Sequence, residues 1–240
     1  MTSFALKIIA LISMFCDHFG DAYINHFSVL NLIGRCAFPI FAFQISEGFA
    51  HTKNIKKYFL RLGLFAFISQ IPFSLFTYNF FNIGLLESFL SLNVFFTLFL
   101  GLLSIFLYDY IIKLFRKKES ISTSFFLDKI IGILVVLLIA YIAELLNTDY
   151  GFWGVIVTFM FYLFKNDKLA MIISFITLCI IKYGIQIISS GYNLAYVLLC
   201  IFTILPIIFI CLYNGKQGKK IKYLLYLFYP THLLLLYFIF

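Results

Sequence analysis

Nine apolar stretches occupy most of this chain, and their length constrains its fold more than any other feature. A helix that crosses a membrane needs about 20 mostly apolar residues, because the hydrocarbon core is about 30 Å thick. The stretches run approximately over 4–24, 28–50, 57–78, 90–113, 129–147, 152–165, 168–187, 194–213 and 223–240. Hydrophobic residues make up 63% of the 240 residues, against about 45–50% in a soluble domain. The sequence therefore predicts one all-α, polytopic membrane helix bundle over residues 1–240, with about nine transmembrane helices.

Basic residues in the connections predict how this bundle is oriented. Every second connection is rich in Lys or Arg, and the connections between them hold almost none. Cytoplasmic loops carry an excess of positive charge, so this alternation predicts a multi-pass protein of the cytoplasmic membrane with its N-terminus inside. The net charge of +8 follows from this topology and gives no reason to expect nucleic-acid binding. Lys182, near the outer end of the seventh stretch, is the exception.

Ionisable side chains inside the apolar stretches indicate a site within the membrane. Such a group near the centre of a spanning helix costs about 2.5–3.5 kcal/mol on insertion scales. Asp17 and His18 lie in the first stretch and Arg35 in the second. At about 1.5 Å per residue, His18 and Arg35 reach a similar depth in the outer half of the membrane. His232 lies near the middle of the last stretch. We expect these groups to pair inside the bundle.

His18 and Arg35 each have two interpretations. A neutral imidazole in a cavity can take a proton from an amine or hydroxyl, so His18 is a candidate general base. The other interpretation of His18 is an interhelical hydrogen bond. Arg35 could bind a thioester oxyanion or a phosphate, or it could form a structural ion pair with Asp17 or Glu47. Glu47 lies near the cytoplasmic end of its stretch, where a capping or solvated carboxylate is the simpler interpretation.

The pattern of His and Cys residues predicts no metal site. The four histidines lie at different depths without an HExxH spacing, and the five cysteines lie in apolar stretches without a CxxC spacing. The cysteines are expected to be small buried hydrophobic residues. The histidines are His18, His26, His51 and His232, and the cysteines are Cys16, Cys36, Cys179, Cys200 and Cys211.

Six blocks of sequence resemble the TraX family, membrane proteins named for the conjugative-pilus protein that N-acetylates pilin. The blocks follow one another in the family's order and cover most of the chain. They are LKIIALISMFCDH (Leu6–His18), IGRCAFPIFAFQISEGF (Ile33–Phe49), HTKNIKKYFLRLGLFAFISQIPF (His51–Phe73), LNVFFTLFLG (Leu92–Gly101), DYGFWGV (Asp149–Val155) and KYLLYLFYPTHLLLL (Lys222–Leu236).

The resemblance implies kinship with membrane acyltransferases, which pass an acyl group from cytosolic acyl-CoA to an acceptor at or beyond the membrane. A histidine in an early helix is their usual base, and the Asp17–His18 pair is at the matching position. The expected reaction is direct acetyl transfer from acetyl-CoA to a peptide or glycan, such as the N-terminus of a pilin-like peptide. His18 would act as base, Arg35 would hold the oxyanion, and Asp17 would position His18 through a neighbour.

Two further roles complete this expected mechanism. His232 would protonate the leaving thiolate or line the acceptor pocket. A cytoplasmic basic patch would hold the phosphates of the donor, although topology alone also explains its charge. The patch consists of Lys53, Lys56, Lys57 and Arg61.

Two other classes of protein fit the same sequence. Intramembrane Asp, Glu, His and Arg residues can relay protons, so a proton-coupled transporter is one alternative. Inverted repeats, which many transporters have, are not evident in the chain. A non-catalytic subunit for pilus or secretion assembly is the other alternative. Dependence on coenzyme A separates the acyltransferase from both.

The alternating charge gives a direct test of topology. Cysteines introduced at Ser120 and Ser190 should react with a membrane-impermeant thiol reagent from opposite sides, because an odd number of helices separates them. Labelling of both positions from one side would contradict nine helices with the N-terminus inside.

Overall fold

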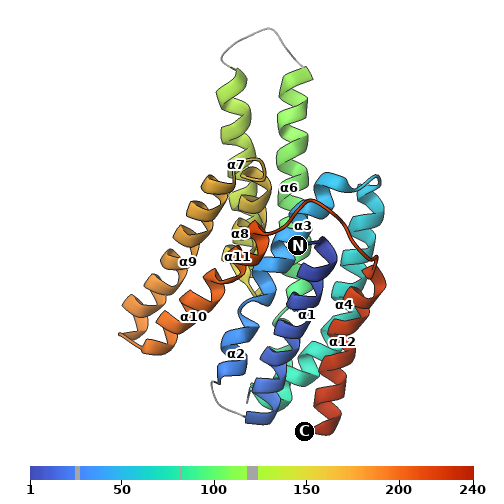
Figure 1. Ribbon diagram of the computed structural model, residues 1–240, viewed down its shortest axis with the longest axis vertical. Helices are drawn as coiled ribbons and strands as arrows, with labels where there is room; N and C mark the ends of the chain where they lie inside the picture. Colours follow the sequence, from blue (N-terminus) through green and yellow to red (C-terminus); the bar gives the residue numbers. More distant parts are fainter. Residues whose placement is uncertain (25–27, 82, 118–123) are drawn as a thin grey trace.

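The computed structural model describes residues 1–24, 28–81, 83–117 and 124–240, and its regular structure there is helical (Figure 1). The elements in order are α1 (Ser3–Phe19), the π-helical turn η1 (Gly20–Ile24), α2 (Val29–Gly34), α3 (Ala37–His51), α4 (Ile55–Phe80), α5 (Leu85–Leu90), α6 (Val94–Lys117), α7 (Ser124–Leu145), α8 (Gly151–Leu163), α9 (Lys168–Ser190), α10 (Leu194–Ile204), α11 (Pro206–Cys211) and α12 (Lys222–Ile239). Each predicted stretch coincides with one helix or a consecutive pair, so the all-α helix bundle is confirmed. His26, Lys118 and Ser120 lie outside the described residues.

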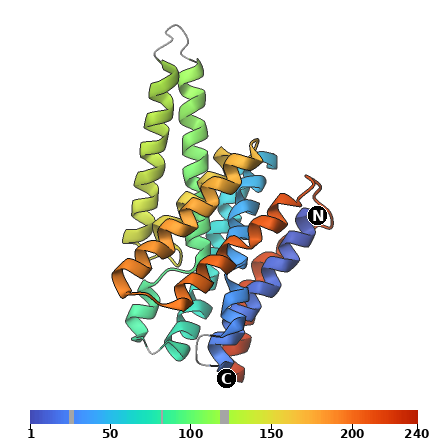
Figure 2. The ribbon, with the colours of Figure 1, turned by 60° about the vertical axis from the view of Figure 1, so that its left-hand side comes forward.

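Six segments of the described chain are long and apolar enough to cross a membrane. They are Ser3–Ile24, Val29–His51, Ile55–Phe80, Val94–Phe115, Lys168–Ser190 and Leu194–Cys211. Two shorter apolar helices, α8 and α12, pack among them, and α7 pairs with α6 in a long hairpin (Figures 1 and 2). These segments define a helical membrane protein. Which end faces the cytoplasm stays a prediction.

The N-terminus and the connection after α11 lie together at one end of the bundle, and the C-terminus lies at the other (Figure 1). The amino group of Met1 donates to the carbonyl of Leu212 at 2.6 Å, and the N–H of Ser3 donates to the carbonyl of Lys216 at 2.9 Å. This basic connection is therefore on the same side as the N-terminus, as the charge alternation predicts.

The second predicted stretch is broken at Arg35, which corrects the expectation of one helix over 28–50. Proline lacks an N–H, and its ring clashes with the carbonyl four residues earlier, so Pro39 leaves the Arg35 carbonyl without its helical partner. Helix α2 accordingly ends at Gly34, and α3 begins at Ala37. Pro72 and Pro230 lie inside the continuous helices α4 and α12.

A second proline break meets the first. Pro206 separates α10 from α11 and leaves the carbonyl of Phe202 without a helical partner. The thiol of Cys36, which lies in the break between α2 and α3, donates to that carbonyl at 3.5 Å. This contact joins α10 to the break between α2 and α3, and the ring N–H of Trp153 on α8 donates to the Leu178 carbonyl of α9 at 3.1 Å.

Candidate functional site

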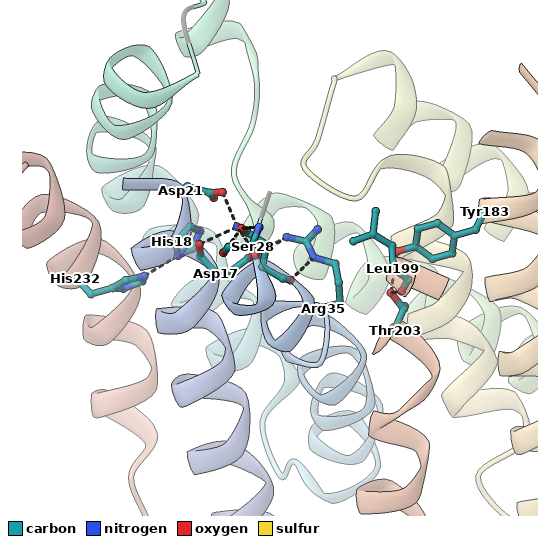
Figure 3. A network of polar contacts seen from close by, with 10 residues as sticks. Asp17, His18, Asp21, Ser28, Arg35, Tyr183, Leu199, Thr203 and His232 are labelled. Carbon is teal, nitrogen blue, oxygen red and sulfur yellow. Dashed lines mark hydrogen bonds and ion pairs between the residues drawn. The ribbon is translucent and has the colours of Figure 1, made fainter. Parts of the chain in front are cut away.

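An ion pair between Asp17 and Arg35 joins the last turn of α1 to the break after α2. The Arg35 Nη2 atom donates to Asp17 Oδ1 at 2.6 Å and Oδ2 at 2.5 Å (Figure 3). Its Nε atom donates to the Asn31 carbonyl at 3.2 Å. The Arg35 side chain is 29% exposed and that of Asp17 is 13% exposed. Of the two partners considered for Arg35, the structure selects Asp17 rather than Glu47.

Asn31 and Gly34 on α2 fix the position of Asp17. The Asn31 side chain donates to the Asp17 carbonyl at 3.2 Å and to Asp21 Oδ1 at 2.6 Å. Asp21 lies four residues after Asp17 and therefore shares its side of the helix. A Cβ atom on Gly34 would overlap the Asp17 carboxylate. The absence of a side chain there lets α2 approach closely enough for the ion pair to form.

His18 pairs with His232 on α12 rather than with an acid. His18 Nδ1 lies 2.8 Å from His232 Nε2, and His232 Nδ1 lies 2.7 Å from the Phe228 carbonyl oxygen (Figure 3). A carbonyl can only accept, so His232 Nδ1 carries a proton. In a neutral imidazole His232 Nε2 then accepts, and His18 Nδ1 donates to it. This network assigns the lone pair of His18 to Nε2, the nitrogen that can take a proton.

The predicted link from Asp17 to His18 is not present among the described residues. Asp17 contacts Arg35 and Asn31, and the ring of His18 packs against apolar and aromatic groups. The Phe76 ring lies edge-on to it at 5.4 Å between centroids, and the Tyr229 ring lies at 6.0 Å. His18 and the ion pair therefore lie close together but form two separate networks.

Two cavities meet beside His18. The first, called the outer cavity here, has a volume of about 470 Å³ and is lined by His18, Asp17, Asp21, Arg35 and Asp149, among others. The second, the inner cavity, has a volume of about 410 Å³ and lies toward the N-terminal end; its polar lining includes Lys7, Gln44, Glu47, Arg61 and Tyr226. Both cavities are lined by Met14, Phe41, Val94 and Tyr229, which form the wall between them.

Only one of the four residues of the basic patch lines the inner cavity. Arg61 lines the inner cavity on α4. Lys53, Lys56 and Lys57 are exposed near the start of the same helix and do not line it. Phosphate binding by these three lysines stays a prediction.

Asp149 lines the outer cavity, and Lys182 contacts Tyr150, which also lines it; neither residue was given a role in the site from the sequence. The N–H of Asp149 donates to the Leu92 carbonyl at 2.8 Å, and this contact places the α7–α8 connection over the cavity. Lys182, the exception to the charge pattern, has its Nζ atom 4.2 Å from the ring centre of Trp153 and 5.4 Å from that of Tyr150. Asp149, Tyr150 and Trp153 all belong to the DYGFWGV block. Their place in this block was the sequence feature that could have identified them as site residues.

The chain belongs to the TraX family, whose model, described as TraX protein, matches residues 3–240. It is 28% identical over 246 residues to a "Probable fimbrial assembly protein FimC, serogroup H1" of Dichelobacter nodosus, covering 98% of this chain and 94% of that protein. It is also 26% identical over 163 residues to an uncharacterised protein of Rickettsia prowazekii (strain Madrid E), covering 68% of this chain and 56% of that protein. No solved structure matches significantly.

Removing Arg35 tests the ion pair. Arg35→Gln leaves the Asp17 carboxylate without its cation inside the membrane. Breaking a buried pair costs about 3–5 kcal/mol, and we expect on the order of 3 kcal/mol, the lower end, because the Arg35 side chain is 29% exposed. The free energy of unfolding in mixed detergent micelles measures it.

Lys113→Gln is the matched control. Lys113 pairs with Asp109 at 2.6 Å, one turn away on α6, but its side chain is 72% exposed. Such helical pairs contribute about 0.3–0.5 kcal/mol. Equal losses for the two variants would contradict a structural role for the Asp17–Arg35 pair.

The raised pKa of Asp149 should make the stability of the fold depend on pH. Its enclosure by protein raises its pKa from 3.8 to about 6; Asp17 adds to the rise, and the cations Arg35 and Lys182 oppose it. Between pH 4 and 6 the folded state therefore holds a proton that the unfolded state has lost, and this contribution to stability falls as pH rises. Asp149→Asn should be most stabilising, relative to the unmodified chain, above pH 6. A difference that does not change between pH 4.5 and 7 would refute the shift. Melting temperatures across this range measure it.

Proposed function

We propose that this chain is a membrane acyltransferase that moves an acetyl group from cytosolic acetyl-CoA to an acceptor in the outer half of the membrane. The observation that carries the proposal is the position of His18. Its ring lines the outer cavity beside the wall shared with the inner one, and its network leaves Nε2 able to take a proton. A base in one cavity, next to the wall shared with the other, suits a reaction in which donor and acceptor arrive from opposite sides.

The proposed reaction needs one base and one leaving group. The acceptor amine or hydroxyl attacks the thioester carbonyl carbon while His18 Nε2 takes its proton. The tetrahedral intermediate then expels the coenzyme A thiolate, the C–S bond breaks, and His18 returns the proton to sulfur. Such a base contributes about 10²–10⁴-fold in rate.

His232 is better suited to positioning His18 than to protonating the thiolate. Both of its ring nitrogens are engaged, Nδ1 with the Phe228 carbonyl and Nε2 with His18. The pairing orients His18 and fixes its tautomer; positioning His18 was the role first expected of Asp17. Asp17 instead holds Arg35 at the edge of the outer cavity. Arg35 there offers a positive charge to an anionic intermediate or to an acceptor carboxylate.

The inner cavity suits an anionic donor. Lys7 and Arg61 line it, and the exposed Lys53, Lys56 and Lys57 lie near its end of the bundle. Acetyl-CoA carries its negative charge on phosphates at the end far from the thioester. The phosphates would thus remain near the predicted cytoplasmic end while the acetyl group approaches the wall.

A non-catalytic assembly subunit is the second candidate, and the name of the Dichelobacter nodosus relative favours it. The two candidates differ in one measurable property. An acyltransferase releases coenzyme A from acetyl-CoA and acetylates an acceptor, whereas an assembly subunit does neither. Mass spectrometry of membrane proteins and glycans from cells with and without the chain would identify an acetylated acceptor.

Replacing His18 tests the mechanism. His18→Ala should lower acetyl transfer from acetyl-CoA by about 10²–10⁴-fold, with donor binding and melting temperature little changed. A purely structural interhelical hydrogen bond would be worth about 0.6 kcal/mol, so its loss would lower stability slightly and spare the rate. His18→Gln separates the two roles, because glutamine can keep a hydrogen bond but cannot accept the proton. Near-normal turnover in both variants would remove His18 from catalysis.

A further inference from the structure

Tyr229 on α12 lies in the wall between the two cavities. Of the four residues that line both, Met14, Phe41 and Val94 are apolar, and Tyr229 is the one with a polar group. Its ring centre lies 6.0 Å from that of His18 and 5.8 Å from that of His232. Any group transferred between the cavities therefore passes next to this side chain.

The backbone N–H of Val94 can donate to the Tyr229 oxygen, but the hydroxyl proton has no acceptor among the described residues, although the residue is only 2% exposed. A buried donor without an acceptor is destabilising, whereas a phenylalanine would pack against Phe95 without that penalty. Buried donors nearly always have an acceptor, so this one suggests an acceptor that binds later.

Two further buried donors around the inner cavity have the same property. Gln44 Nε2 and Arg61 Nε are enclosed and unpaired within the described chain, and both residues line this cavity. All three groups can donate a hydrogen bond. A ligand that satisfies them carries a series of acceptor oxygens, as does the arm of an acyl-CoA with its two amide carbonyls and its thioester carbonyl.

We propose that the Tyr229 hydroxyl donates a hydrogen bond to the thioester carbonyl oxygen of the donor and stabilises the negative charge that forms there. This assignment rests on the proposed acyltransferase function. As the acceptor's new bond to the carbonyl carbon forms, the C=O electron pair moves to oxygen and the hydrogen bond strengthens. The pair returns when the C–S bond breaks, and Tyr229 keeps its proton throughout.

The geometry explains why Tyr229 suits this role better than Arg35. The Arg35 Nη2 atom already donates to Asp17, and Arg35 lines only the outer cavity and not the inner one. The Tyr229 hydroxyl is enclosed, so the proposed donor would reach it by displacing Met14, which lines both cavities with it and has an unbranched side chain that adapts readily.

Tyr229→Phe tests the assignment in protein reconstituted into lipid vesicles. The assay follows release of coenzyme A from acetyl-CoA, with short peptides and amino sugars as acceptors. Loss of one such donor typically lowers kcat about 10²–10³-fold. We expect a fall of that size, a KM for acetyl-CoA within about twofold of normal, and a melting temperature that changes little, because the hydroxyl proton has no acceptor in the described chain.

Tyr183→Phe is the matched control. The Tyr183 hydroxyl is also buried, but it bonds to Thr203 at 2.7 Å and lines neither cavity. This variant should lose stability and keep its kcat.

Each outcome decides the matter. Normal kcat in Tyr229→Phe, with an active unmodified protein, overturns the Tyr229 assignment and leaves the acyltransferase intact. A joint loss of kcat and melting temperature, or failure of the variant to fold, shows a structural hydroxyl and also overturns it. No coenzyme A release by the unmodified protein overturns the acyltransferase proposal itself.

Discussion

The Asp17–Arg35 ion pair is the constraint on which the site depends. Each charge alone would be costly within a membrane helix, so the two side chains must meet before the first two segments can pack stably. Their meeting requires Gly34 to have no side chain and α2 to end where it does. The same contact brings Asn31 and Asp21 into the polar cluster. His18, next to Asp17 on the helix, is thereby directed away from the pair and toward α12.

The residues expected at the site were largely identifiable from sequence, and Asp17 was one of the two partners considered for Arg35. The pairing of His18 with His232 could not be singled out. Apolar length and the cost of burying a charge are local properties, so they mark the helices and single out Asp17, His18 and Arg35. The hydrogen bond from His18 to His232 spans 214 residues, and no local pattern encodes it. The roles of Asn31 and Asp149 were missed for a related reason. An asparagine or aspartate near a helix end resembles an ordinary cap or turn until the opposite segment is in place.

The two cavities have different linings, so the two ends of the bundle differ chemically. One opens among basic and tyrosine side chains toward the N-terminal end, and the other lies among the carboxylates near the α7–α8 connection. The wall between them is thin and contains the flexible Met14. An enzyme acting across a membrane needs such a partition, because an open channel would let ions pass. A transporter would instead need the whole path to open alternately to each side.

The contact between Cys36 and the Phe202 carbonyl makes two distant prolines act as a single unit. Pro39 opens the helix that bears Cys36, and Pro206 frees the carbonyl that receives its thiol. Replacing one of the two prolines would restore the helical hydrogen bond to the carbonyl four residues earlier. The other break would then lose the group that it contacts. The peripheral helices would depend on their other contacts, such as the hydrogen bond from the Trp153 ring N–H to the Leu178 carbonyl on α9. Membrane helices tilt to match the thickness of the bilayer, so a tilt of the α9–α10 pair would act through the Cys36 contact on the residue next to Arg35.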